Sequence, residues 1–267
     1  MYNKIVLLCL LLSNFVAFAQ DGSLKISKQV ITLKTTRLEI NNDGFPKQCD
    51  LLDGNTEVKR QKLLFEPMHF HFYTGAKAQE KMNGTGVNIT TQNADSIVWN
   101  AISTSANLKM DVQGKMLSNG VVSYHINITA INDILLTTMN FHIPFEKTAS
   151  KYLAGLGEKG GLRPDTVRWK LSNWQKIKPS VWIGNDSLGL YFSLNKPTTL
   201  LPSNGAMQIN VKGGSMLLDV NADQITLKKD EQVSFDFNLI ITPQIPTELR
   251  IPVKKKLKFY RKLVQQS

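Results

Sequence analysis

Apolar and polar residues alternate with a period of two along most of this chain, which is the pattern of half-buried β-strands. The stretch Met68–Tyr73 is the clearest example. A strand there has two faces, one carrying Met68, Phe70 and Phe72 and the other carrying His69, His71 and Tyr73. Turn residues interrupt the alternation about every ten residues, so the strands are expected to be short.

The same pattern predicts many strands along the body of the chain. They include Val30–Leu33, Thr36–Ile40, Met68–Tyr73, Leu108–Val112, Val121–Ala130, Ile134–Ile143, Val181–Ile183, Leu188–Leu194, Met207–Val211, Ser215–Val220 and Val233–Ile241. Asn83-Gly84 and Asn119-Gly120 predict hairpin turns, because both central residues of a type I′ turn need a positive φ. Helical periodicity is rare, and Pro144–Ser150 is the short helix that we expect in the body.

The expected fold is all-β, a large antiparallel β-sandwich of about fifteen strands with little helix. No linker rich in proline and serine divides the body, so we expect one sandwich domain over residues 20–245. The chain has 267 residues, of which 42% are hydrophobic and 20% charged. This composition is globular, and the length is sufficient to bury a core.

Residues 1–19 have the pattern of a secretory signal peptide. Lys4 precedes the apolar run Ile5–Leu12, and Ala17-Phe18-Ala19 supplies the small-x-small cleavage pattern. We therefore expect a periplasmic or secreted protein, cleaved near Ala19. The sequence predicts no transmembrane segment, since no other apolar run is long enough. Cys49 is the only cysteine after the signal, so no intramolecular disulfide is expected.

The net charge of +11 is concentrated in a basic C-terminal tail, residues 246–267. Its positive residues are Arg250, Lys254, Lys255, Lys256, Lys258, Arg261 and Lys262. A nucleic-acid-binding protein would instead spread its basic residues over a folded surface, so no nucleic-acid partner is expected. We expect a solvated or frayed terminus, with binding to anionic polymers or lipid headgroups as the alternative.

The segment Lys151–Leu194 combines a glycine cluster with three of the four tryptophans, Trp169, Trp174 and Trp182. The cluster Gly155–Gly161 contains the spacing Gly-x-Gly-x-x-Gly, which in dinucleotide-binding folds opens a helix. Pro164 follows here and no amphipathic helical run is present, so we interpret the cluster as a loop. No cofactor is expected.

A known family carries the same features. The matching residues are Gly155–Gly161, Arg163-Pro164, Val181–Asp186 with Gly189-Leu190, and, upstream, Leu38–Pro46 and Glu66–Phe70. With these motifs the chain resembles, from about Leu24 to Pro243, the N-terminal β-sandwich of glycoside hydrolase family 123-like proteins. Those are exported bacterial proteins related to N-acetylgalactosaminidases.

The resemblance implies a (β/α)₈ barrel after the sandwich, and substrate-assisted hydrolysis by an adjacent Asp-Glu pair. Nothing that resembles this barrel is present, so we expect a truncated relative or a stand-alone module with a separately encoded barrel. Asp230-Glu231 is the one adjacent acidic pair. Lysines flank it in what we expect to be a solvated turn, and they would lower its pKa, which does not suit a general acid. We assign no catalytic residue.

The four histidines do not predict a metal site. His69 and His71 share one strand face and could share an ion, but a zinc site needs a third protein ligand. His125 and His142 lie on other predicted strands, and nothing in the sequence brings them to the first two. We therefore interpret the histidines as structural. Cys49 has no recognisable catalytic partner, and no serine lies in a nucleophile elbow.

The tryptophans are the better binding candidates, because indole rings stack on the apolar faces of sugars. The candidate carbohydrate-binding residues are Arg168, Trp169, Asn173, Trp174 and Lys176. The alternative is that the three tryptophans only cover the edge of the sandwich, and Trp182 is expected to lie partly in the core. The glycan could contain N-acetylhexosamine.

Two functions follow from these observations. The first is an exported, non-catalytic module that binds glycan or supports a glycosidase. The second is a glycoside hydrolase active in its own right, with a site that the sequence does not reveal. The absence of an acid pair suited to catalysis favours the first. A gene product without retained function is a third possibility.

Overall fold

The computed structural model describes residues 24–51, 61–75, 78–173, 178–195, 205–222, 224–242 and 253–265. The expected signal peptide lies outside these ranges. The described residues form strands β1 to β22, two 3₁₀ turns and one α-helix. Several strands have only two to four residues, which explains why the sequence pattern predicted about fifteen.

The largest sheet has nine strands and forms one layer of the molecule. In order across the sheet these are β15 (Glu158–Leu162), β14 (Tyr152–Gly155), β17 (Ser180–Gly184), β18 (Gly189–Leu194), β22 (Gln232–Thr242), β11 (Val121–Ala130), β10 (Leu108–Leu117), β9 (Ser96–Thr104) and β8 (Asn83–Gln92). All of its neighbouring strands pair antiparallel.

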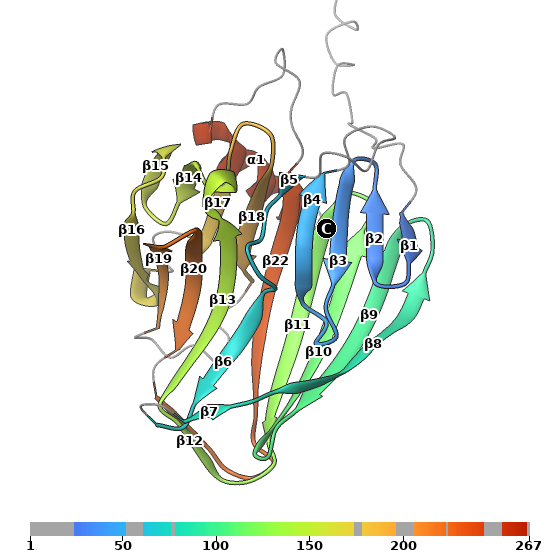
Figure 1. The fold of residues 1–267 in the computed structure, drawn as a ribbon, viewed down its shortest axis with the longest axis vertical. Coiled ribbons are helices and arrows are strands. Elements are labelled where there is room, and N and C mark those ends of the chain that lie inside the picture. Colours follow the sequence, from blue (N-terminus) through green and yellow to red (C-terminus); the bar gives the residue numbers. More distant parts are fainter. Residues whose placement is uncertain are drawn as a thin grey trace, which may run out of the picture.

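Two smaller sheets form the facing layer. The six-stranded sheet has the order β16 (Thr166–Lys170), β19 (Ala206–Lys212), β20 (Ser215–Ala222), β13 (Thr138–Glu146), β6 (His69–Tyr73) and β7 (Gln79–Glu80). The five-stranded sheet has the order β1 (Lys25–Ser27), β2 (Val30–Leu33), β3 (Thr36–Ile40), β4 (Pro46–Leu51) and β5 (Gln61–Lys62). Figure 1 shows these two sheets side by side in front of the nine-stranded one.

The remaining elements are small. Strands β12 (Ile134–Leu136) and β21 (Ile225–Leu227) form a separate pair, and η1 (Lys147–Ala149) and η2 (Leu171–Asn173) are single 3₁₀ turns. Helix α1 (Val253–Gln265) follows at the C-terminal end. The all-β antiparallel sandwich predicted from the sequence is therefore confirmed. No helix among the described residues has the length and apolar character to cross a membrane.

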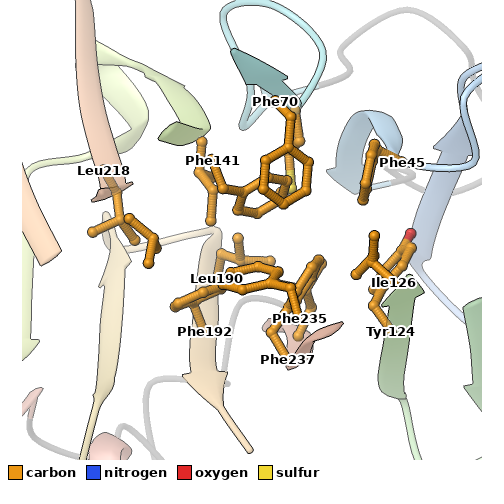
Figure 2. Packing of buried hydrophobic residues seen from close by; sticks show 14 of the residues in the cluster. Phe45, Phe70, Tyr124, Ile126, Phe141, Leu190, Phe192, Leu218, Phe235 and Phe237 are labelled. Carbon is orange, nitrogen blue, oxygen red and sulfur yellow. The ribbon is translucent and has the colours of Figure 1, made fainter. Parts of the chain in front are cut away.

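An aromatic core holds the two layers together. Phe45, Phe70 and Phe141 point inward from the front sheets and meet Phe235 and Phe237 of β22 (Figure 2). The ring centroids of Phe70 and Phe235 are 5.4 Å apart, and those of Phe141 and Phe237 are 5.0 Å apart. Each buried aromatic side chain contributes about 1.5–3 kcal/mol through removal of apolar surface from water. The core therefore fixes which face of each strand points outward.

The two Asn-Gly pairs have different outcomes. Asn119-Gly120 lies in the predicted hairpin turn between β10 and β11, but only Gly120 has a positive φ, of 86°, so the turn is not of type I′. Asn83-Gly84 instead begins strand β8, so the turn predicted there is wrong. Gly84 allows a close backbone approach, since a Cβ on it would lie 2.8 Å from the carbonyl oxygen of Asn42. The helix predicted over Pro144–Ser150 is reduced to the single turn η1, because β13 continues through Pro144.

The glycine cluster forms a hairpin, as its interpretation as a loop requires. Strands β14 and β15 flank a turn at Leu156 and Gly157, both with positive φ. Gly155 also has a positive φ, and a Cβ there would come within 2.3 Å of the Ser180 carbonyl oxygen. The cluster therefore shapes the edge of a sheet and does not open a helix.

Residues 253–265 of the basic tail are not a frayed terminus. Helix α1 packs on the outer side of the nine-stranded sheet, beside β14 and β17. Tyr260 is 5% exposed and lies in a second hydrophobic cluster with Trp182 and Tyr191. Arg261 donates a hydrogen bond of 2.7 Å from Nε to Ser180 Oγ. Trp182 is thus buried beneath the helix, in agreement with the expected core role.

Candidate functional site

A row of polar side chains crosses the outer face of the six-stranded sheet. The strand register places His69 of β6 beside His142 of β13, and His142 beside Asp219 of β20. Asp219 in turn lies beside Gln208 of β19, which lies beside Arg168 of β16. Because side chains alternate between the two faces of a strand, residues paired in register share one face. Five strands thus each contribute one residue to a continuous polar row.

On each of these strands, the residue before or after the row points into the core. Phe70, Phe141, Val220, Met207 and Trp169 form the matching inner row, and each is at most 8% exposed. Trp169 is 3% exposed, and its Nε1 has no hydrogen-bond partner among the described residues. The prediction of an accessible indole at Trp169 is therefore wrong, because this position belongs to the buried face of β16.

The other predicted sugar-binding residues divide into two groups. Arg168 is exposed on the outer face of β16, and Asn173 is half-buried in η2. Trp174 and Lys176 lie outside the described residues. Of the predicted set, the structure therefore places Arg168 in the polar row, while a binding role for this segment remains a prediction.

Three histidines gather at one end of the row. One imidazole nitrogen from each of His69, His71 and His142 lies within 4.8 Å of those of the other two. The ring centroids of His69 and His71 are 4.5 Å apart, those of His71 and His142 are 4.5 Å apart, and those of His69 and His142 are 5.2 Å apart. The expectation that nothing brings His142 to the other two is wrong, because β13 pairs directly with β6.

Two of the three rings are held by hydrogen bonds through Nδ1. His69 Nδ1 lies 2.8 Å from the carbonyl oxygen of Pro67, and His142 Nδ1 lies 2.6 Å from Asp219 Oδ1. A carbonyl oxygen only accepts, as does an ionised carboxylate, so each Nδ1 carries the proton and donates. In the neutral ring the lone pair is then on Nε2. The hydrogen-bond partners of both rings thus fix the same tautomer, with the proton on Nδ1.

The Nε2 atom of His142 is buried and has no hydrogen-bond partner within the described part of the chain. The side chains of His142 and Asp219 are both 13% exposed, so water has little access to this pair. A buried polar atom without a partner costs about 1–3 kcal/mol. The lone pair of His142 is therefore an unsatisfied acceptor, close to two other imidazoles.

The pKa values of His71 and of nearby Asp43 are shifted in opposite directions. Burial, reinforced by the neighbouring His142 and His69, lowers the pKa of His71 to about 4. Burial raises the pKa of Asp43 above its ordinary value, although the Phe45 amide that donates to its carboxylate opposes this shift. Both shifts favour the neutral form, so at neutral pH His71 is an uncharged base.

Two cavities lie along the polar row. The first has a volume of about 440 Å³ and is lined by His69 and His71 together with Asp43, Glu80 and Asn83 among other residues. The second, of about 380 Å³, is lined by polar residues of four strands. These are Thr138, Asn140, Arg168, Gln208, Asp219 and Asn221. Asp219 lines the second cavity and binds His142, which contacts the two histidines of the first.

A second pair of histidine and aspartate lies on the nine-stranded sheet. His125 of β11 is paired in register with Asp236 of β22, and His125 Nδ1 lies 2.5 Å from Asp236 Oδ1. The Asn127 side chain contacts the other ring nitrogen of His125 at 3.1 Å. The side chains of His125 and Asp236 are 50% and 26% exposed. This pair resembles that of His142 but lies on an open surface.

The adjacent acidic pair is not part of the polar row. Asp230 and Glu231 are exposed in the turn between β21 and β22, and Glu231 accepts a 2.7 Å hydrogen bond from the Lys228 amide. The solvated turn expected from the sequence is confirmed. Asp219, Asn140 and Gln208 were missed as site residues, because period-two alternation gives the face of each residue but not the register between strands.

Comparisons with known proteins place the chain in a family. The model of the glycoside hydrolase 123 third domain matches residues 24–243. The chain therefore belongs to the family of glycoside hydrolase 123 third domains, and the predicted relationship to glycoside hydrolase 123 is confirmed. The match describes this unit as a third domain, whereas the sequence motifs suggested an N-terminal one. No curated protein matches the sequence.

Solved structures share the fold at low sequence identity. Galactose 1-epimerase from Lactobacillus acidophilus NCFM is 9% identical, with a TM-score of 0.50 over 81% of this chain and 94% of that one. A GalM/aldose epimerase homologue from C. elegans is 8% identical, with a TM-score of 0.45 over 84% and 99%. Heparan sulfate lyase HepC from Pedobacter heparinus is 9% identical, with a TM-score of 0.47 over 85% and 37%. At 9% identity, the likeness to galactose 1-epimerase describes the fold alone.

Proposed function

We propose that this protein is an exported, non-catalytic β-sandwich module of carbohydrate processing, and that it binds glycan on the outer face of its six-stranded sheet. A catalytic partner, such as a separately encoded barrel, acts on the same glycan. The export proposal rests on the signal pattern of residues 1–19. The family, named for glycoside hydrolase 123, supports the carbohydrate class.

The polar row carries this proposal. Sugar rings present many hydroxyl groups, which pair with amides, carboxylates and guanidinium groups placed on a rigid surface. The cavity of about 380 Å³ offers Arg168, Gln208 and Asp219 from three adjacent strands. The strands fix the spacing of these groups before a ligand arrives, so binding costs little ordering of the protein.

The names of related solved proteins agree with this class. The galactose 1-epimerase is a sugar-processing protein by its name, so at least one protein of similar fold handles a sugar. This agreement supports carbohydrate as the ligand but does not select one sugar. An N-acetylhexosamine-containing glycan is the first to test, because the family resemblance includes N-acetylgalactosaminidases.

Calorimetric titration of the untagged chain with N-acetylhexosamine oligosaccharides tests the proposal. We expect Arg168→Ala and Gln208→Ala each to weaken binding roughly fivefold to tenfold, which corresponds to about 1 kcal/mol for a lost hydrogen bond. The matched controls are Lys115→Ala and Gln113→Ala, which change exposed residues of β10 on the other sheet. They should leave the affinity unchanged.

Two results would contradict this proposal. The first is a wild-type chain that binds none of these oligosaccharides at millimolar concentration. The second is equal loss of affinity in the variants of the polar row and in the β10 controls, since binding would then not occur on the outer face of the six-stranded sheet. Circular dichroism of each variant establishes that the fold is retained.

One observation favours a second function, a glycoside hydrolase active in its own right. Asp43 and His71 line the same cavity of about 440 Å³, where burial raises the pKa of Asp43 and lowers that of His71. Acid–base catalysis in glycosidases uses carboxyl groups whose pKa is raised by burial, and an uncharged imidazole can accept a proton. If the chain hydrolyses aryl N-acetylhexosaminides, Asp43→Asn should remove that activity and Asp230→Asn should not.

A further inference from the structure

We propose that His69, His71 and His142 form a zinc-binding site at the end of the polar row. Three neutral imidazoles are the complete protein ligand set of a three-histidine zinc centre. Here they come from two paired strands, with His69 and His71 two residues apart on β6 and His142 opposite His69 on β13. The hydrogen-bonded ladder therefore holds the ligand side chains in a fixed register.

The spacing of the nitrogens suits one ion after a small adjustment. Zinc–nitrogen bonds of about 2.0–2.1 Å in tetrahedral geometry place ligand nitrogens about 3.3 Å apart. The three nitrogens already lie within 4.8 Å of one another. Rotations of the histidine side chains cover the remaining difference, because His69 and His71 are only half-buried. No movement of the β-strands is required.

The hydrogen bonds of the rings orient them for metal binding. Metal-bound histidines usually donate their other ring N–H to a carbonyl or carboxylate, which fixes the tautomer and raises the basicity of the ligand nitrogen. His69 does this through Pro67, and His142 does it through Asp219. Both leave Nε2 as the donor atom for a cation. The buried, unpartnered Nε2 of His142 is the atom that gains most from a bound ion.

The ligand set selects the type of ion. Nitrogen ligands suit Zn²⁺ and its neighbours in the transition series, whereas Mg²⁺ and Ca²⁺ prefer oxygen ligands. With three protein ligands, a tetrahedral ion keeps one position for water or a substrate oxygen. His69 and His71 line the cavity of about 440 Å³, so this position can face the cavity. The site is thus an open zinc centre of the kind that can polarise an oxygen ligand.

This inference does not depend on the proposed glycan binding. Zinc binding is measured without sugar, and glycan affinity can be measured after removal of metal. A failure of one proposal therefore leaves the other to be judged on its own data.

The experiment is a calorimetric titration of the untagged, metal-free chain with zinc chloride at pH 7.5. A polyhistidine tag must be absent, because it would itself bind the ion. We expect one ion per chain with micromolar or tighter affinity. His71→Ala and His142→Ala should each weaken binding by more than about 100-fold, which exceeds the loss expected for an orienting partner. Asp219→Asn should weaken it by about 10–100-fold.

His125→Ala is the matched control, because His125 also contacts an aspartate on the neighbouring strand but has no second histidine near it. It should leave zinc affinity unchanged. Replacement of zinc by cobalt(II) gives a second readout, since tetrahedral coordination by histidines produces intense visible absorption bands. This spectrum should disappear in His142→Ala and persist in His125→Ala.

Absence of one-to-one binding by the folded wild-type chain at 100-fold molar excess of zinc would overturn the proposal. Equal affinities for zinc in His142→Ala and His125→Ala would overturn it as well, because the ion would then bind elsewhere. If His142→Ala does not fold, His71→Asn serves in its place, since His71 is half-buried and has less packing to lose. Retention of the cobalt spectrum in that variant would equally reject the site.

Discussion

Two pairs of histidine and aspartate, one on each layer of the sandwich, share almost the same contact but have different surroundings. In both, a histidine Nδ1 lies 2.5–2.6 Å from an aspartate on the neighbouring antiparallel strand. The His142–Asp219 side chains are each 13% exposed, whereas His125 is 50% exposed. The pair itself therefore does not define a site, because the neighbours of the histidine decide what its second nitrogen can do.

The strand on the other side of each histidine explains the difference. Beyond His142 the register places His69 of β6, and beyond His125 it places Gln113 of β10. Asn127 contacts the second nitrogen of His125, whereas that of His142 is unpartnered among the described residues. One pair is therefore complete within its own sheet, and the other has an unused acceptor beside two imidazoles.

The largest expected effect concerns the core on which both pairs rest. Phe141 precedes His142 on β13, and Phe235 precedes Asp236 on β22, and both are 0% exposed. Phe141→Ala and Phe235→Ala should each lower the free energy of unfolding by about 3–5 kcal/mol, measured by urea denaturation. A much smaller loss at only one position would show that the two pairs are not supported by an equally packed core.

An intermediate effect should separate the two aspartates. Asp219→Ala removes the partner of a largely buried histidine and should cost about 1–3 kcal/mol of unfolding free energy. Asp236→Ala breaks a more exposed pair and should cost about 1 kcal/mol or less. The same urea titrations of metal-free protein measure both. Equal costs would remove the distinction between a buried and an open pair.

The smallest effect is kinetic and leaves the fold intact. Diethyl pyrocarbonate modifies accessible, neutral imidazoles, so His125 should react several-fold faster than His142 in the metal-free chain. Peptide mapping by mass spectrometry measures the two rates in one sample. Faster reaction at His142 would mean that its ring is more accessible than its 13% exposure indicates.

The sequence predicted those features that depend on residues close together along the chain. The alternation in Met68–Tyr73 correctly assigned the histidines and phenylalanines to opposite faces of β6. Asn119-Gly120 lies in its predicted hairpin turn, but Asn83-Gly84 does not. Gly84 is needed for a different reason, because the backbone of Asn42 lies too close to leave room for a side chain. Local composition does not distinguish a turn glycine from one beneath a neighbouring strand.

The candidate site depended on distant residues, and it was largely missed. His142 is separated from His71 by more than sixty residues, and only the pairing of β13 with β6 joins them. Trp169 was assigned to a binding surface because polar residues such as Arg168 and Asn173 surround it in the sequence. The segment is in fact strand β16, which exposes Arg168 on its outer face and buries Trp169 on its inner one.

The strict alternation of polar and apolar residues in β6 also disfavours a shifted register between β6 and β13. If β6 slipped by one residue against β13, His69 and His71 would turn into the core while Phe70 and Phe72 turned outward. Such a misfolded state would bury the polar imidazole rings and expose two phenyl rings to water, and both changes would raise its free energy. The histidine cluster therefore forms in the same register that places Phe70 and Phe72 in the core. The presence of the cluster therefore indicates that β6 and β13 are paired in the native register.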